Sequence, residues 1–318
     1  MEDPVTPIEV LSIDDFLAAK FELVPDIVDG IIPGHGVIAM AGKPKAGKTN
    51  LTLGLCTATW IGGPFLGRTA RQVRTLFIGE EGGPASLQKR LKSMVGEDSE
   101  KASRDSFLGI AMRQGVRLDT PDGMARLDDA MAAADPGFVV LDCLVRMHRL
   151  AENDARDMAA LMEALEDLAS RHQSAILFNH HLAKVSEGSA GGYAMRGSGV
   201  LASSTEANLI LRRSKTRASL TGELREGADV HIDLEFDEAS LQFRPVVNSA
   251  TASRGKPSEE QVLAALQASP GSTIDQIAKS LSTSDTSLRP IVASLVRSQA
   301  VGASPASSGR GQVYRVAA

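Results

Sequence analysis

Short apolar runs alternate with longer segments of helical periodicity between residues 30 and 250. Brief, continuous apolar runs of this kind are typical of strands buried on both faces. Strands that alternate with helices indicate an α/β fold, in which a mostly parallel sheet is covered by helices on both sides. We expect five such strands, at Gly36–Met40, Val73–Ile78, Phe138–Leu141, Ala175–Phe178 and Asn208–Leu211.

The pattern changes after this core. Alternating polar and apolar residues at 231–236 and again at 241–243 predict an antiparallel hairpin that closes the sheet. Residues 248–256 are rich in Ser, Ala and Gly and show no periodicity, which indicates an exposed linker. Beyond it we expect three helices and two strands, as in a winged helix. The predicted helices are 259–268, 274–281 and 285–298, and the predicted strands are 300–303 and 312–316.

These patterns predict the domain organisation of the 318-residue chain. We expect an N-terminal arm at 1–24, a large α/β domain at 25–247, a linker at 248–256 and a small α+β domain at 257–318. Chains of this length usually exceed one domain of about 100–200 residues.

Composition narrows the classes of protein that fit. Hydrophobic residues make up 43% of the chain and charged residues 23%, as in globular proteins. With only Cys56 and Cys143, a disulfide framework or a cysteine-rich zinc site is excluded. The sequence has no apolar run of about 18 residues and no basic, then apolar N-terminal signal, so we expect a cytoplasmic protein that does not enter a membrane.

Charge is distributed unevenly. The net charge of -5 argues against bulk electrostatic attachment to nucleic acid. From Arg254 onward, however, seven Lys and Arg residues face four Asp and Glu residues, a charge of +3. The C-terminal segment therefore differs in kind from the acidic core.

A phosphate-binding loop follows the first predicted strand and precedes a helical segment. The sequence from Gly42 to Thr49 fits the pattern G-x-x-x-x-G-K-[ST] in the strand–loop–helix context that the chemistry requires. Its glycines let backbone N–H groups surround phosphate oxygens, while Lys48 reaches the β- and γ-phosphates and Thr49 coordinates Mg²⁺. We therefore expect ATP with Mg²⁺ to be bound by Gly42, Lys43, Pro44, Lys45, Ala46, Gly47, Lys48, Thr49 and Asn50.

Three other predicted strands end in polar residues at the same edge of the sheet, where open α/β sheets bind ligands. Asp142 ends an apolar strand and is our candidate for the acid on the Mg²⁺ side, although a strand-end Asp can also cap a helix. Of the adjacent acids Glu80 and Glu81, only one is expected to face the nucleotide, and we choose Glu80. The alternative is a solvated acidic turn.

The third of these strands ends in His180 and His181, followed by a Gly-rich loop at 186–198 that contains Arg196. A donor here can contact the γ-phosphate. Metal binding by this pair is disfavoured, because adjacent strand residues point to opposite faces and no Cys or third His stands nearby.

In this order the elements resemble the RepA-like hexameric helicases, a family of RecA-type ATPases, over roughly residues 25–245. Besides the loop at 42–49, the segments that carry the resemblance are 77–81 with 87–91, 141–148, Glu152-Asn153 with Met158, His180-His181 and 196–198.

The resemblance implies a RecA-like P-loop core in a ring, usually a hexamer, that hydrolyses ATP on DNA. It implies that Glu80 is the catalytic base, Asp142 the Mg²⁺-side acid, His180 a γ-phosphate sensor and Arg196 an arginine finger inserted into a neighbouring subunit. Related ring ATPases carry a basic pair near the last strands, so the competitors for the finger are Lys215, Arg217 and Arg225.

The segment 257–318 is a departure, because members of this family often end with the ATPase core. In a winged helix, the third helix would offer Arg289 and Arg297 to DNA, and the wing would offer Arg310. The alternative use is protein docking. Two functions therefore stay open: a translocating helicase or helicase loader, and a non-translocating recombination mediator or regulator. A metabolic kinase is disfavoured, because no lid or acceptor-binding segment is evident.

Overall fold

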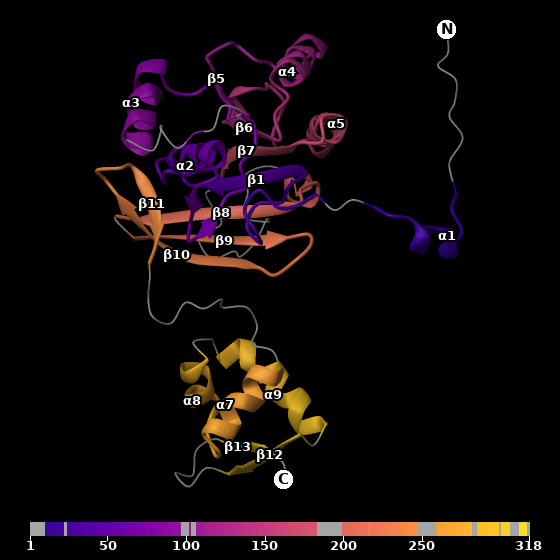
Figure 1. The fold of residues 1–318 in the computed structure, drawn as a ribbon, viewed down its shortest axis with the longest axis vertical. Coiled ribbons are helices and arrows are strands. Elements are labelled where there is room, and N and C mark those ends of the chain that lie inside the picture. The colour runs from indigo at the N-terminus through magenta and orange to yellow at the C-terminus, as the bar shows by residue number, and fades with distance from the viewer. Residues whose placement is uncertain are drawn as a thin grey trace.

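A nine-stranded sheet forms the centre of the N-terminal part of the chain (Figure 1). This computed structural model describes residues 10–21, 24–96, 102, 106–182, 199–215, 217–246, 259–281, 285–298, 300–305 and 312–316. The strand order is β11-β10-β9-β8-β1-β7-β6-β4-β5. Their bounds are β1 (Gly36–Gly42), β4 (Thr75–Gly79), β5 (Leu108–Met112), β6 (Phe138–Asp142), β7 (Ala175–His181), β8 (Ala207–Ser214), β9 (Arg217–Leu224), β10 (Val230–Asp237) and β11 (Gln242–Pro245).

The six strands from β8 to β5 pair in parallel, and β9, β10 and β11 continue the sheet as an antiparallel ribbon. All five strands predicted from apolar runs are present, and so is the predicted hairpin of β10 and β11. The prediction missed β5 and β9. Neither looks like the other central strands: β5 is apolar in sequence but has no fully buried residue, and polar residues at every second position interrupt β9.

Helices cover both faces of this sheet (Figure 1). One hydrophobic cluster joins α2 (Lys48–Ile61) and α3 (Pro84–Val95) to alternate strand residues such as Phe77, Val140 and Leu177. The opposite cluster joins α4 (Pro121–Ala134) and α5 (Ala155–Arg171) to the intervening residues such as Ile78, Leu141 and Phe178. Because side chains alternate across a strand, one residue of register decides which face a side chain meets.

Shorter elements accompany these layers. Helix α1 (Ile13–Ala18) precedes the sheet and has no buried residue. The others lie between the elements already described: the hairpin of β2 (Pro64–Phe65) and β3 (Arg68–Thr69), the 3₁₀ turn η2 (Leu144–Arg146) and α6 (Val200–Ser203). Ser12 caps α1, accepting a hydrogen bond from the Asp15 N–H at 3.1 Å. Among the described residues, no helix has the length and apolar character needed to cross a membrane.

The C-terminal segment has a hydrophobic cluster of its own, which includes Val262, Leu288 and Tyr314. Thr273 and Gln276 form a capping box at the start of its second helix. The elements follow the predicted order of three helices and an antiparallel strand pair: α7 (Glu259–Ala268), α8 (Ile274–Ser280), α9 (Asp285–Arg297), β12 (Val301–Pro305) and β13 (Gln312–Val316). The predicted linker lies outside the described residues, and the domain boundaries stay predictions.

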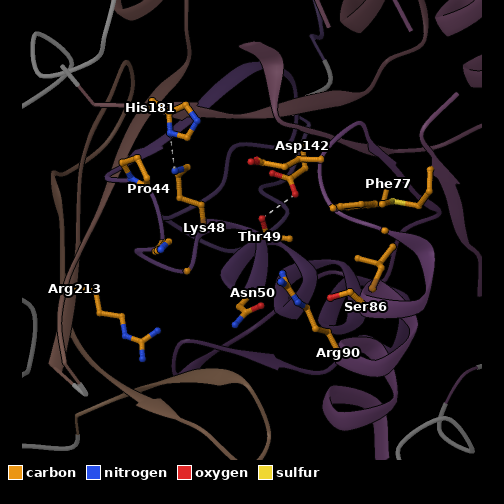
Figure 2. A pocket seen from close by; sticks show the side chains of 17 residues that line it. Pro44, Lys48, Thr49, Asn50, Phe77, Ser86, Arg90, Asp142, His181 and Arg213 are labelled. Carbon is orange, nitrogen blue, oxygen red and sulfur yellow. Dashed lines mark hydrogen bonds between the residues drawn. The ribbon is translucent and has the colours of Figure 1, made fainter. Parts of the chain in front are cut away.

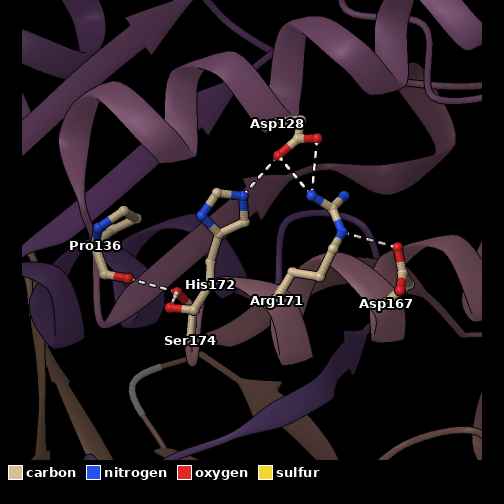
Figure 3. A network of polar contacts seen from close by, with 6 residues as sticks. All are labelled: Asp128, Pro136, Asp167, Arg171, His172 and Ser174. Atoms are coloured by element: carbon tan, nitrogen blue, oxygen red, sulfur yellow. Dashed lines mark hydrogen bonds and ion pairs between the residues drawn. The ribbon is translucent and has the colours of Figure 1, made fainter.

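A polar network ties α4 to the end of α5, as Figure 3 shows. Asp128 Oδ1 lies 2.6 Å from His172 Nε2, and Arg171 Nη1 donates to both Asp128 oxygens at 3.1 and 3.0 Å. Arg171 Nε also donates to Asp167 at 3.0 Å. The His172 hydrogen bond, and after it that of Arg171, lowers the pKa of the Asp128 carboxyl below its usual value.

We expect Asp128→Ala to lower the melting temperature by about 1–2 °C at pH 7, because a half-exposed ion pair is screened by solvent. A carboxyl whose pKa is lowered on folding stabilises the protein above its unfolded pKa, and this contribution is lost as pH falls through the folded value. The difference from wild type should therefore shrink as the pH falls toward about 3. Calorimetry across this range checks it, with Asp129→Ala as the exposed neighbouring control. A difference independent of pH would contradict it.

Candidate functional site

The phosphate-binding loop joins β1 to α2 in close contact with the last strands of the sheet. Gly47 has φ 101°, and a Cβ there would lie 2.8 Å from the Phe243 ring. A Cβ at Gly42 would lie 2.8 Å from the Leu211 carbonyl oxygen. Glycine is therefore required at both ends of the loop, at Gly47 for its left-handed backbone as well as for space.

Lys48 begins α2 and is mostly buried, with 7% of its surface exposed. Its Nζ donates to the Gly42 carbonyl at 2.9 Å and lies 3.4 Å from the Lys43 carbonyl and from His181 Nδ1. Burial lowers the pKa of this amine, while the nearby Cys143 and Asp142 act in the opposite direction. An ammonium held away from water interacts strongly with an incoming anion, since the local dielectric is low.

Thr49 and Asp142 lie side by side on the wall of the same cavity (Figure 2). Thr49 Oγ1 donates to Asp142 Oδ2 at 2.8 Å, and Asn179 Nδ2 donates to Asp142 Oδ1 at 2.7 Å. Burial raises the pKa of Asp142, and the hydrogen bonds from Asn179 and Thr49 oppose that rise. A hydroxyl and a carboxylate in contact form a fragment of an oxygen-ligand set that suits Mg²⁺, which takes few protein ligands beside phosphates and water.

The cavity has a volume of about 490 Å³ and opens between the loop, α3 and β8. Cations line it from several elements, and two acids stand among them. The lining residues are Pro44, Lys45, Gly47, Lys48, Thr49, Asn50, Phe77, Glu81, Gly82, Gly83, Ser86, Leu87, Arg90, Met112, Asp142, His181 and Arg213. The chemistry of this set fits a nucleoside triphosphate with its magnesium ion.

The expectation that Glu80 faces the nucleotide does not match the geometry. Glu81 lines the cavity, whereas Glu80 Oε1 accepts a hydrogen bond from the Val116 N–H at 3.1 Å, away from it. Glu81 follows Phe77 and Gly79 on the α2 side of the sheet, and Glu80 follows Ile78 on the α5 side. Period two, counted from the buried Phe77, is the signal that identifies Glu81.

The same displacement by one residue occurs at β7. His181 lines the cavity and reaches Lys48, whereas His180 is fully buried on the opposite face, with Nε2 3.7 Å from Glu152 Oε1. Asn179, which was not among the predicted site residues, shares the His181 face and donates to Asp142. Leu177 is buried on the α2 side of the sheet, so alternation along β7 predicts that Asn179 and His181 lie on that same side, which carries the cavity.

A comparison with protein families agrees with this architecture. A family model described as an AAA domain matches residues 3–187, more than half of the chain. The chain belongs to the AAA domain family. This domain is a RecA-like P-loop ATPase domain, so nucleotide binding and hydrolysis follow from membership. No curated protein matches the chain.

The AAA domain match includes β1 to β7, and with them the loop, both acids at 80–81, Asp142 and both histidines. It ends before β8, from which Arg213 reaches the cavity. The Arg213 guanidinium lies 3.9 Å from the centre of the Phe236 ring, a cation–π contact that fixes its position. Arg90 reaches the cavity from α3. Neither arginine was among the predicted site residues.

The predicted trans-acting residues lie in different surroundings. Arg196 is outside the described residues, and so is Arg310. Arg225 forms an ion pair with Glu206 of its own chain at 3.1 Å and donates to the Ser203 carbonyl. Its guanidinium is therefore engaged within the subunit. Lys215 and Arg217 are exposed at the turn between β8 and β9, while Arg289 and Arg297 are exposed on α9.

Proposed function

We propose that this AAA domain protein is a RecA-type ring ATPase acting on DNA, as a RepA-like replicative helicase or a helicase loader. The observation that carries the proposal is that cationic side chains occupy two separate places, the cavity and an exposed turn. Lys48, Arg90 and Arg213 line the cavity, whereas Lys215 and Arg217 stand exposed at the β8–β9 turn of the same sheet. A turn that presents two cations outward suits insertion into the nucleotide site of a neighbouring subunit.

Within one subunit, each group has a distinct task in hydrolysis. Lys48 and the backbone N–H groups of the loop neutralise the phosphates, and Thr49 with Asp142 holds Mg²⁺. Glu81, on the cavity wall, accepts a proton from the attacking water. His181, 3.4 Å from the Lys48 Nζ, is placed to detect the γ-phosphate that Lys48 contacts. The nucleotide chemistry thus uses the face of the sheet covered by α2.

The missing part of such a site is a cation that stabilises the transition state from the next subunit. We assign this role to the β8–β9 turn, with Arg217 as the leading residue and Lys215 beside it. Arg196 remains a competitor, and it lies outside the described residues. Arg225 is disfavoured by its ion pair with Glu206.

Mixing two inactive variants tests this assignment. Arg217→Ala protein and Glu81→Gln protein should each hydrolyse ATP slowly, but an equimolar mixture should recover measurable turnover, because some interfaces then combine an intact acid with an intact arginine. The recovery should peak near equal amounts in a phosphate-release assay. Arg225→Ala is the matched arginine control and should need no partner. Absence of recovery at every ratio would contradict a role for Arg217 in trans.

The C-terminal segment supports contact with DNA. Its three helices and strand pair suit a winged helix, and α9 exposes Arg289 and Arg297. These two exposed arginines, with a modest charge of +3 from Arg254 onward, favour phosphate binding over base reading. The same segment also favours a second function, an ATP-dependent switch or recombination mediator that stays at one place on DNA.

The steady-state ATPase rate with and without single-stranded DNA, measured at low salt, separates the two functions. For a translocating ring we expect strong stimulation, because DNA in the channel orders the interfaces between subunits. An unchanged, slow rate would contradict translocation and favour the switch. Arg289→Ala with Arg297→Ala tests the C-terminal contribution to duplex binding in the same buffer.

A further inference from the structure

Cys143 lies at the junction of the two strands that carry the acids of the cavity. It directly follows Asp142, and only 1% of its surface is exposed. Gly79 pairs with Asp142 across β4 and β6, and the Glu80 N–H donates to the Asp142 carbonyl at 2.8 Å. This pairing brings the Cys143 Sγ to 3.4 Å from Glu81 Oε2, with the thiol donating.

We propose that Cys143 is a positioning residue that holds the Glu81 carboxylate in the orientation needed to activate water. The inference rests on the proposed role of Glu81. A thiol donor at one carboxylate oxygen leaves the second oxygen to accept from water, since a carboxylate has acceptor sites on both oxygens.

The thiol is suited to this role because it is a donor held in one place. Only 1% of the surface of Cys143 is exposed, so its Sγ is enclosed by the protein. An S–H group offers one hydrogen bond, and Glu81 Oε2 accepts it at 3.4 Å.

Glu81 needs such a restraint because its surroundings are otherwise permissive. Glu81 is exposed, and the two glycines that follow give the backbone freedom. Gly82 has φ 76°, and a Cβ at either glycine would meet nothing within 4 Å. A general base with several free torsions loses rate through misorientation, and displacement by about 1 Å can cost up to 10²-fold.

The test measures turnover of Cys143 variants in two backgrounds of the full-length protein. Cys143→Ala should lower kcat about three- to tenfold with KM for ATP unchanged, and Cys143→Ser should restore most of kcat because its hydroxyl donates to the same oxygen. In the Glu81→Gln background, Cys143→Ala should have no further effect on the residual rate. Cys56→Ala, which removes the other buried thiol, should leave kcat unchanged.

Two results would overturn the positioning role. One is an equal loss from Cys143→Ala in both backgrounds, which would indicate packing alone. The other is a normal kcat in Cys143→Ala while Glu81→Gln is inactive. If Glu81→Gln itself kept full turnover, the proposed role of Glu81 would fail instead, so the two failures are distinguishable.

A spectroscopic measurement is independent of turnover. In Cys56→Ala protein, Cys143 carries the only S–H group, because the chain has two cysteines. Its infrared S–H stretching band should lie at lower frequency than that of a thiol without a hydrogen bond. It should move to higher frequency in Cys56→Ala/Glu81→Gln, where a charged acceptor becomes a neutral one. An unmoved band would show that the thiol does not donate to Glu81.

Discussion

Glu81→Gln should lower ATP turnover by about 10²–10⁴-fold, the usual contribution of a general base, while Glu80→Gln should stay close to wild type. Glu81 lines the cavity beside Asp142 and Lys48, so its carboxylate is placed to accept a proton from water. Glu80 accepts a hydrogen bond from the Val116 N–H at 3.1 Å, and the amide oxygen of glutamine can accept the same bond. Steady-state phosphate release measures both variants.

These two substitutions form a matched pair. Each replaces one carboxylate by an amide of the same shape, and the positions are adjacent, so differences in folding or expression should be small. Nucleotide affinity should be retained in both variants, because each substitution keeps the shape of the side chain and leaves every residue of the loop that holds the phosphates unchanged. A large loss in Glu80→Gln together with a normal Glu81→Gln would reverse the assignment and restore the choice made from sequence alone.

Lys48→Ala should lower turnover by about 10²–10³-fold, comparable to the removal of one strong donor to a developing charge. The protein should nevertheless fold. The Lys48 ammonium is buried and its pKa is lowered by burial, so the folded state bears a desolvation cost that the alanine variant lacks. We therefore expect the free energy of unfolding to change by less than about 1 kcal/mol, because the Gly42 carbonyl loses one donor but keeps the Leu182 N–H at 3.4 Å.

Thermal unfolding and binding of a fluorescent ATP analogue separate the two effects of Lys48→Ala. The melting temperature should be nearly that of wild type, while analogue binding should weaken strongly. Lys89→Ala removes an exposed lysine on α3 that does not line the cavity, and it should change neither quantity. Normal turnover by Lys48→Ala would contradict the phosphate site.

Much of the fold can be predicted from the sequence because the central strands are buried on both faces. Each of β1, β4, β6 and β7 therefore needs a continuous apolar run, which also marks the strand end where chemistry occurs. The edge strand β5 is apolar in sequence at 108–112 but is not buried on both faces, since Ile110 is 41% exposed. The antiparallel β9 is only partly buried, and polar residues alternate along it, so no continuous apolar run marks it as a strand.

At two positions the residue predicted from sequence and the residue that lines the cavity differ by one. Glu80 was chosen where Glu81 faces the cavity, and His180 where His181 does, because motif order locates a strand end but not its face. Face is set by alternation from a residue whose side is known, such as Phe77. Arg90 and Arg213 could not be found this way, since a helix and a strand distant in sequence bring them to the cavity.

The phosphate-binding loop packs against strands that are synthesised late, and this affects how the chain folds during synthesis. β1 lies between β7 and β8, so its second edge stays unpaired until the ribosome has released residues 207–214. Phe243, which packs against Gly47, emerges later still. We therefore expect that the first 187 residues, although they contain the AAA domain match, do not fold as a unit. A nascent or truncated chain ending there would expose a buried central strand as an open edge, which is a template for aggregation.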